Sequence, residues 1–213
     1  MSGARSSEGV LRFTLTERAL HWAFAIGYLL LLASGLPLMV PALRSWIRGY
    51  SPLIGERLHL ACAIFWVLAT LGVLALGDRG RVGRTLGELA RLEPDDRPWL
   101  RRFPRWLVAA PGERARLDRA VGRFNAGQKI NAIFTVLTAS LLLITGIALW
   151  PFGADGLWRD AHRWLTMFVL IPIAGHVFLA AVHPSTRHAL TGMLDGRVDR
   201  EWAATHHPRW EPK

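Results

Sequence analysis

The sequence predicts an all-α membrane protein, organised as a bundle of four transmembrane helices. Hydrophobic residues make up 51% of the 213 residues. In addition, four segments without Asp, Glu, Lys or Arg are long enough for the roughly 20 residues that a helix needs to cross a bilayer. These segments are residues 19–43, 58–77, 130–154 and 164–186. No room remains for a separate soluble domain of ordinary size, so we expect one transmembrane domain over residues 1–213.

Helix-breaking residues locate the ends of the expected helices. The first segment is closed by Pro37 and Pro41, the second by Gly77 with Asp78, and the third by Pro151 with Gly153. The expected helices are residues 18–40, 57–77, 128–150 and 161–183. The first segment is too long for a cleaved signal peptide and lacks a small-residue cleavage site after it. We therefore expect it to remain as a membrane anchor.

The net charge of +10 is distributed unevenly along the chain. With the N-terminus inside, 21 Lys and Arg residues fall in the inner segments and five in the outer loops. The positive-inside rule therefore places both termini in the cytoplasm, together with the loop of residues 78–127 and the tail of residues 184–213. A basic inner rim suits anionic membrane lipid, so we expect lipid and no nucleic acid as a partner.

The loop of residues 78–127 is predicted to be ordered or docked cytoplasmic structure rather than a flexible linker. It carries several large apolar side chains, namely Trp99, Phe103, Trp106 and Leu107. Such side chains are apolar enough to lie on the membrane surface or on a partner.

Four histidines lie inside or at the rims of the apolar segments: His21, His59, His162 and His176. An imidazole in hydrocarbon costs free energy unless its nitrogens have partners, so these residues are candidate site residues. The directions of the helices place His21 and His176 near the inner side and His59 and His162 near the outer side. His176 follows His162 by 14 residues. That spacing is about 21 Å of rise and about 40° short of four whole turns, so both point the same way.

Matching depths pairs His59 with His162 and His21 with His176. Two imidazoles on one haem iron leave no open coordination position, which favours electron transfer over oxygen chemistry. We therefore predict two b-type haems, an outer and an inner one, that form an electron path across the membrane. The alternative for any one of these histidines is a hydrogen bond to a neighbouring helix.

The other four histidines are not expected to bind haem. They lie at the inner rim or in the cytoplasmic tail, where we expect solvated or partner-facing side chains and no haem ligands: His183, His188, His206 and His207. Small surfaces for a macrocycle or a neighbouring helix are expected at Gly35, Gly146 and Gly175.

A polar stretch, residues 122–129, leads directly into the third apolar segment at the inner rim. Asn125, Gln128 and the backbone around Gly127 supply hydrogen-bond donors and acceptors at the depth of the inner haem, which suits a quinone carbonyl. A helix N-terminus also presents unpaired backbone N–H groups to a quinone oxygen. The alternative is helix capping by Asn125, with Lys129 as an interfacial anchor.

The chain resembles a known family, the gamma subunit (cytochrome b556) of membrane-bound respiratory formate dehydrogenase. The resemblance extends over nearly the whole chain and includes the spacing from His162 to His176. The matching segments are Arg12-Phe13, Thr16-Glu17-Arg18-Ala19-Leu20-His21-Trp22, Ser34-Gly35-Leu36, Gly122-Arg123-Phe124-Asn125-Ala126-Gly127-Gln128-Lys129, Thr145-Gly146-Ile147-Ala148-Leu149-Trp150 and His206-His207-Pro208-Arg209-Trp210. The Asn-Ala-Gly-Gln-Lys segment and the His-His-Pro-Arg-Trp tail are the more specific of them.

The resemblance implies a subunit of a complex in a bacterial cytoplasmic (inner) membrane. A molybdenum- or tungsten-containing alpha subunit oxidises formate, and an iron–sulfur beta subunit relays the electrons. The gamma subunit then passes them through two haem b groups to menaquinone or ubiquinone. The family's quinone pocket corresponds here to Asn125, Gly127, Gln128 and His176. Lys129 matches the motif without an assigned role, and the arginine-rich stretch 78–121 departs from the family pattern.

Three other functions fit the same histidine pattern. A cytochrome b subunit of a membrane-bound nickel–iron hydrogenase uses a similar haem path with another electron donor. A stand-alone cytochrome b561-like carrier works without a tightly bound partner complex. A haem-free anchor or transporter shows no haem absorbance.

Overall fold

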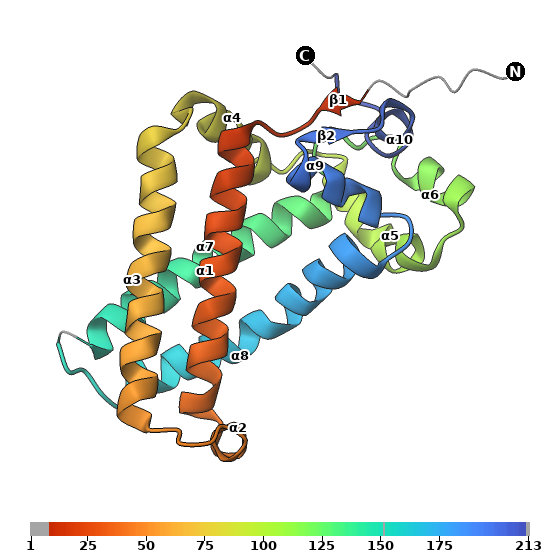
Figure 1. Ribbon diagram of the computed structural model, residues 1–213. Helices are drawn as coiled ribbons and strands as arrows, with labels where there is room; N and C mark the ends of the chain where they lie inside the picture. Colours follow the sequence, from red (N-terminus) through yellow and green to blue (C-terminus); the bar gives the residue numbers. More distant parts are fainter. Residues whose placement is uncertain (1–8, 151, 212–213) are drawn as a thin grey trace, which may run out of the picture. The chain divides into compact units, whose positions relative to one another are not determined.

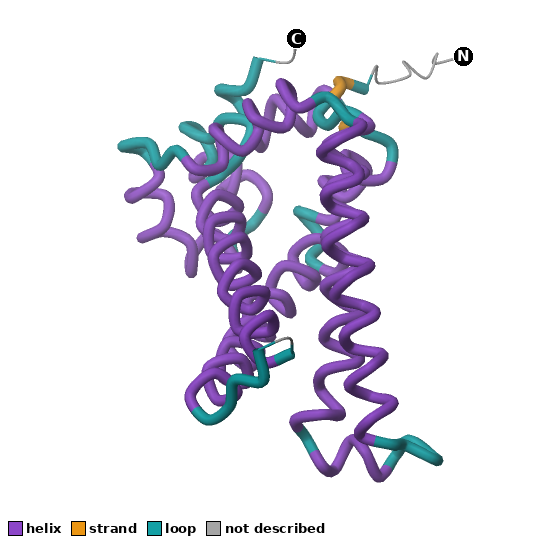
Figure 2. The backbone as a smooth tube through the Cα atoms, turned by 90° about the vertical axis from the view of Figure 1, so that its left-hand side faces the viewer, coloured by secondary structure: helices purple, strands orange, loops and turns teal. Residues whose placement is uncertain are grey.

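The computed structural model describes residues 9–150 and 152–211, most of which are helical (Figure 1, Figure 2). Four long helices are apolar enough to cross a membrane, by length and composition. They are α1 (Leu15–Met39), α3 (Pro52–Leu76), α7 (Ala126–Leu149) and α8 (Leu157–Val177), the last continued by the π-helix η1 (Phe178–Val182). The predicted all-α fold with four long apolar helices is confirmed.

α1 ends at Met39, within one residue of the predicted 18–40, and it continues through Pro37, one of the two prolines expected to close it. A proline near a helix end removes one backbone hydrogen bond and leaves the preceding turns intact. The Arg44 side chain then covers the last carbonyls: its Nε donates to the Pro37 oxygen at 2.6 Å and its Nη2 to the Leu38 oxygen at 2.5 Å. Pro41, the other proline expected to close the segment, marks the boundary and begins the short helix α2 (Pro41–Ser45).

All four spans begin earlier than predicted, α1 at Leu15 rather than at 18. α3 starts at Pro52 rather than at 57, because proline suits the first turn of a helix, where no backbone N–H is needed. α7 and α8 likewise start at Ala126 and Leu157, ahead of 128 and 161. Pro151, which helped to predict the end of the third helix, lies outside the described residues, as do Arg5 and Lys213 of the charge pattern.

One compact unit of the chain is Leu15–Val82, in which α1 and α3 run antiparallel and side by side (Figure 1). Gly27 allows the two helices to approach, because a Cβ at this position would lie 2.8 Å from the Cβ of Trp66. The Trp66 ring is buried and packs edge-on against Phe24 and Tyr28. The hairpin therefore holds His21, early in α1, and His59, early in α3, at opposite ends.

The second compact unit contains the described residues up to Thr14 and from Gly83 onward. α7 and α8 form its antiparallel helical hairpin, and the chain before it folds into short helices. The elements between the second and third spans are α4 (Arg79–Ala90), α5 (Asp96–Val108) and α6 (Pro111–Leu117). Those of the tail are the 3₁₀ helix η2 (Arg187–Ala189), α9 (Leu190–Leu194), β2 (Arg197–Val198) and α10 (Arg200–His206). β2 pairs antiparallel with β1 (Val10–Leu11), and both strands are orange in Figure 2.

The large aromatic side chains of α5 contradict the prediction that they lie on the membrane surface or on a partner. Trp99 and Trp106 are 6% and 4% exposed and form a core cluster with Val121 and Ala126. Phe103 and Leu107 pack against this cluster. The indole N–H groups of both tryptophans donate to the same oxygen of Asp118, at 3.0 and 2.9 Å. A buried indole needs such an acceptor, and Asp118 provides it within the unit itself.

Candidate functional site

His59 is held by the end of the neighbouring helix within its own unit. Its Nδ1 lies 3.0 Å from the Ser34 hydroxyl of α1. The next residue, Gly35, makes room for the ring, because a Cβ there would lie 3.0 Å from the His59 Cε1 and 3.2 Å from its Nδ1. The predicted small surface at Gly35 is therefore occupied by this imidazole.

His162 has an equivalent environment in the other unit. Its Nδ1 lies 2.7 Å from the Thr145 hydroxyl, which comes late in α7. Gly146 follows, and a Cβ there would lie 3.6 Å from the His162 Cε1, an ordinary contact distance. In both units a hydroxyl residue and a glycine near the end of one helix thus contact a histidine near the start of the next.

His21 lies early in α1, and His176 lies in the last turn of α8. The His21 ring meets the Trp22 ring edge-on, with the centroids 5.4 Å apart. His176 is exposed in the last turn of α8, immediately before the π-helical turn η1, and Gly175 beside it faces open space. Such π-helical turns are frequent at functional sites.

The imidazoles suit haem iron by their chemistry. Neutral histidine nitrogens are haem ligands, and such a ligand commonly donates its other ring N–H to an oxygen of the protein. The contacts at Ser34 and Thr145 supply that second partner. Across the described residues no three His, Cys, Asp or Glu side chains form a group that could hold a bare metal ion.

The start of α7 shows the capping interactions of the alternative prediction. Asn125 Oδ1 accepts from the backbone N–H of Gln128 at 2.9 Å, and Gln128 Oε1 accepts from the backbone N–H of Asn125 at 3.0 Å. This capping box uses the carbonyl oxygens of both side chains and none of their NH₂ hydrogens. Gly127 lies against the Trp99 ring, because a Cβ on Gly127 would be 3.3 Å from the nearest atoms of that ring. Capping and ligand binding by the NH₂ groups are therefore compatible.

The alternative role of Lys129 as an interfacial anchor is wrong. Its side chain is buried, and its Nζ lies 2.9 Å from Asp96 Oδ2 and 3.8 Å from Glu93 Oε2. A buried ammonium group needs such a carboxylate partner, because an unpaired charge is costly away from water. Lys129 thus ties the start of α7 to the start of α5.

The C-terminal tail docks onto the polar stretch that precedes α7. The His207 Nδ1–H donates to the Gly122 carbonyl at 2.7 Å, and the Arg209 backbone N–H donates to the Val121 carbonyl at 3.1 Å. The Arg209 side chain also pairs with Asp95 at 2.6 Å. The His-His-Pro-Arg-Trp tail therefore contacts the residues that directly precede the Asn-Ala-Gly-Gln-Lys segment.

Two of the four remaining histidines contradict the prediction of solvated or partner-facing side chains. His207 is 4% exposed and His183 is 8% exposed. Burial, and then the nearby charge of Arg12, holds the pKa of His207 well below its ordinary value of 6.5, so its ring is neutral at pH 7. The His183 Nε2–H donates to the Leu107 carbonyl at 3.1 Å. Both rings therefore support local structure within this unit.

Arg12 is a buried residue whose role the sequence did not reveal. Its Nη2 donates to the Arg123 carbonyl at 2.9 Å, and Arg123 Nη2 donates back to the Arg12 carbonyl at 2.7 Å. The Arg12 guanidinium lies 5.4 Å from the centroids of the Phe13 and Trp202 rings. Burial, and then the charge of Arg123, lowers the pKa of Arg12 to about 9. A pKa of about 9 leaves the guanidinium charged at neutral pH, and the cation–π contacts with these rings stabilise that charge.

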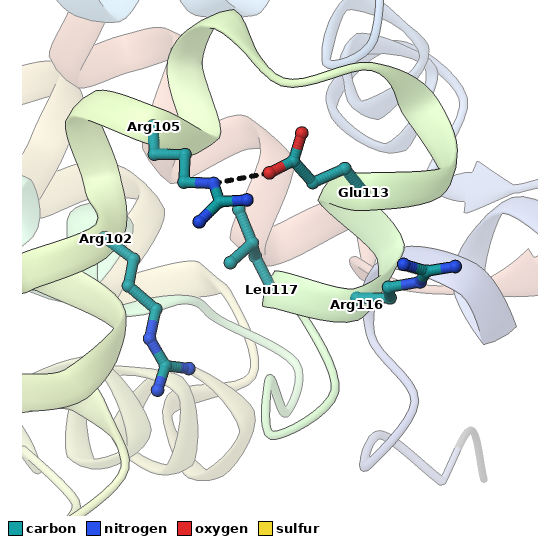
Figure 3. A pocket seen from close by; sticks show the side chains of 5 residues that line it. All are labelled: Arg102, Arg105, Glu113, Arg116 and Leu117. Carbon is teal, nitrogen blue, oxygen red and sulfur yellow. Dashed lines mark hydrogen bonds and ion pairs between the residues drawn. The ribbon is translucent and has the colours of Figure 1, made fainter.

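A separate hollow of about 550 Å³ is lined by Arg102, Arg105, Glu113, Arg116 and Leu117 (Figure 3). Arg105 pairs there with Glu113, as the dashed line in the figure shows. The hollow is lined by residues of α5 and α6, and none of the predicted site residues is among them. It therefore adds nothing to the histidine or Asn125 sites.

Sequence comparisons identify the relatives of this chain. Residues 12–196 match the family model of prokaryotic cytochrome b561. The cytochrome b556(Fdn) subunit of the nitrate-inducible formate dehydrogenase of Escherichia coli K12 is 29% identical over 219 residues, which cover 96% of this chain and 91% of the relative. The cytochrome b556(fdo) subunit of a formate dehydrogenase of the same strain is 24% identical over 94% of this chain and 91% of the relative. A formate dehydrogenase cytochrome b556 subunit of Haemophilus influenzae is 24% identical over 94% of this chain and 82% of the relative.

The match to the family model agrees with the structure at several levels. It covers all four long helices, the four histidines and the polar start of α7. The family's fold has four spans and two haems, and the described helices supply four such spans. The chain therefore belongs to the prokaryotic cytochrome b561 family, membrane electron carriers that bind haem b.

Proposed function

We propose that this chain is the membrane-anchoring di-haem cytochrome b subunit of a respiratory formate dehydrogenase. It passes electrons from an iron–sulfur subunit through two b haems to a quinone at the cytoplasmic side. The observation that carries this proposal is similarity over 94–96% of the chain to cytochrome b556 subunits of formate dehydrogenases. Formate oxidation itself takes place on a molybdenum- or tungsten-containing partner subunit.

The four histidines are the proposed axial ligands of the two haems. His59 and His162 hold the outer haem, and His21 and His176 hold the inner haem. Their positions along the antiparallel helices support this assignment, because each hairpin has one of these histidines near one end and a second near the opposite end. The haem irons supply one-electron redox chemistry, while the histidines fix their positions and complete their coordination.

Asn125, Gly127, Gln128 and His176 form the proposed quinone site. Within their unit, Leu179 of η1 packs against the cluster that contains Ala126, so the start of α7 and the end of the fourth span lie at the same end of the hairpin. The NH₂ groups of Asn125 and Gln128 donate hydrogen bonds to the quinone oxygens. The capping box holds both side chains in place for this role.

The proposed orientation places both termini and the quinone site on the cytoplasmic side of a bacterial inner membrane. It rests on the excess of Lys and Arg in the inner segments. Electrons then enter from the outer side, and the quinone, menaquinone or ubiquinone, takes protons from the cytoplasm. This separation of charge contributes to the membrane potential, with each unit charge worth about 2.3 kcal/mol per 100 mV.

Formate is expected to reduce most of the haem in the intact complex. The complex is purified in mild detergent without oxygen, and the change in haem absorbance after formate is compared with that after excess dithionite. About two haems per copy of this chain, reduced by formate, support the proposal. A full dithionite response without a formate response assigns another donor, such as hydrogen.

A stand-alone electron carrier is the second candidate, favoured by the match to the cytochrome b561 family as a whole. Such a carrier keeps both haems but purifies without an iron–sulfur or a catalytic subunit. Affinity purification of the chain from its native membrane separates the two functions. Co-purification of a molybdenum or tungsten protein favours the formate dehydrogenase subunit.

Replacing Asn125 by Ser is expected to slow quinone reduction about tenfold, because one hydrogen bond to the quinone is lost. Serine is a good N-cap residue, so the capping box keeps its bond to the Gln128 backbone and α7 keeps its stability. Stopped-flow oxidation of the reduced haems by a quinone analogue measures the rate. Both haems should remain in the variant.

Asn125→Ala serves as the comparison, because it removes the cap as well as the NH₂ group. If Asn125→Ser reduces quinone at the wild-type rate and only Asn125→Ala is impaired, Asn125 acts as a helix cap alone. Gln128→Ala should slow quinone reduction to a similar extent as Asn125→Ser.

A further inference from the structure

The two compact units repeat one local arrangement, as shown above for Ser34 with His59 and for Thr145 with His162. The repeat joins residues on α1 and α3 in one unit and residues on α7 and α8 in the other. Each pair therefore offers an independent observation of the same contact. The contact is between a hydroxyl oxygen and an imidazole Nδ1 in both cases.

The direction of these hydrogen bonds follows from the hydroxyl groups. The Ser34 hydroxyl donates to the Leu30 carbonyl at 2.8 Å, and the Thr145 hydroxyl donates to the Leu141 carbonyl at 2.9 Å. A hydroxyl has one hydrogen, and with that hydrogen directed at the carbonyl its oxygen accepts from the imidazole. In this arrangement the proton of each neutral ring is on Nδ1, and Nε2 keeps its lone pair.

We propose that Ser34 and Thr145 are positioning residues that fix the tautomer and orientation of His59 and His162, so that Nε2 of each ring would be available to bind haem iron. This inference rests on the proposed function for the haem and its ligands. The new element is the role of the two hydroxyl groups, which orient the imidazoles before they bind iron. A histidine ligand in the other tautomer would present a protonated nitrogen to the metal.

The neighbouring glycine adds a steric restraint on one side. The His59 ring lies so close to Gly35 that a Cβ would come 3.0 Å from its Cε1, whereas the corresponding distance at Gly146 is 3.6 Å. The orientation of His59 thus depends on both the Ser34 hydroxyl and the bare backbone beside it. The orientation of His162 depends more on the shorter hydrogen bond to Thr145.

The hydrogen bonds also affect the electronic properties of the ligands. An imidazole that donates its Nδ1–H to an oxygen becomes a more basic ligand through Nε2. A more basic ligand favours the ferric over the ferrous state. Removal of either acceptor should therefore shift the midpoint potential of the outer haem to a more positive value.

The test uses Ser34→Ala and Thr145→Val in the complete membrane complex. Potentiometric titration of haem absorbance measures both midpoint potentials, and low-temperature EPR of the oxidised protein reports the ligand orientation. We expect each variant to shift the potential and the EPR signal of the same haem, with the other haem unchanged. The conservative variants Ser34→Thr and Thr145→Ser, which keep a hydroxyl, should resemble the wild type.

Thr138→Val is the matched control, because Thr138 is also a buried threonine of α7. Its hydroxyl donates to the Phe134 carbonyl at 2.8 Å. It therefore has the same local bond as Thr145 but no hydrogen bond to a histidine among the described residues, and we expect no change in either haem. Equal potentials and EPR signals in Ser34→Ala, Thr145→Val and the wild type, at full haem content, overturn the proposal.

Other outcomes separate this inference from the proposed function. Shifts of two different haems by Ser34→Ala and Thr145→Val support positioning by each hydroxyl but overturn the pairing of His59 with His162. Two haems that respond to dithionite and not to formate overturn the formate dehydrogenase assignment. The positioning role is then still decided by the potentials.

Discussion

His176→Ala is expected to remove one of the two haems and to abolish quinone reduction, while formate still reduces the haem that remains. The substitution deletes one axial ligand of the proposed inner haem, and b-type haem is retained largely through its two ligands. It also removes a proposed wall of the quinone site. Haem content per chain, the formate difference spectrum and the rate of quinone reduction measure the three effects.

His188→Ala is the control for this substitution, because His188 is an exposed histidine beyond the end of the fourth span. It should retain both haems and the wild-type rate of quinone reduction. Loss of both haems from a stably folded His176→Ala protein would contradict the assignment of separate outer and inner ligand pairs. Retention of both haems would show that His176 is not a ligand.

The four spans could be predicted from the sequence because the constraint on them is simple. A helix in hydrocarbon must be long and uncharged, and both properties are read directly from composition. The C-terminal ends of the spans were predicted to within one residue, but their starts were less accurate. α3 begins at Pro52 rather than at 57, because the first turn of a helix accepts polar residues and proline that a search for uncharged segments leaves out.

The polar and aromatic residues of the second unit show where sequence patterns fail. Lys129 resembles an interfacial anchor until Asp96 is placed beside it, and Trp99 and Trp106 resemble surface aromatics until Asp118 accepts from their indoles. Each error concerns a partner that is 12 or more positions away in the sequence. Burial of such groups is decided by long-range pairing, which a single sequence does not specify.

Only part of the candidate site could be predicted from the sequence. The four histidines stood out because an imidazole is rare in an apolar segment, but Ser34 and Thr145 did not, since hydroxyl side chains are common in membrane helices. Their role became visible only with the distances to His59 and His162. The signal in the sequence was the recurrence of a hydroxyl residue followed by glycine near the ends of two helices.

Asp118→Ala is expected to destabilise the second unit by about 3 kcal/mol. The substitution leaves two buried indole N–H groups without an acceptor, and each such group costs about 1–3 kcal/mol. It also removes the contact with His206, whose Nδ1 lies 3.4 Å from Asp118 Oδ2. Thermal unfolding of the purified complex in detergent, followed by tryptophan fluorescence, measures the loss.

Asp118→Asn separates the hydrogen bonds from the volume of the side chain. Its amide oxygen still accepts from Trp99 and Trp106, so we expect a loss of about 1 kcal/mol, for the weaker neutral acceptor. Asp195→Ala, at an exposed aspartate of the tail, should unfold like the wild type. Wild-type stability of Asp118→Ala would show that the two indoles find other acceptors.

The Asp118→Ala protein should also lose quinone reduction before it loses its outer haem, because Trp99 lies against Gly127.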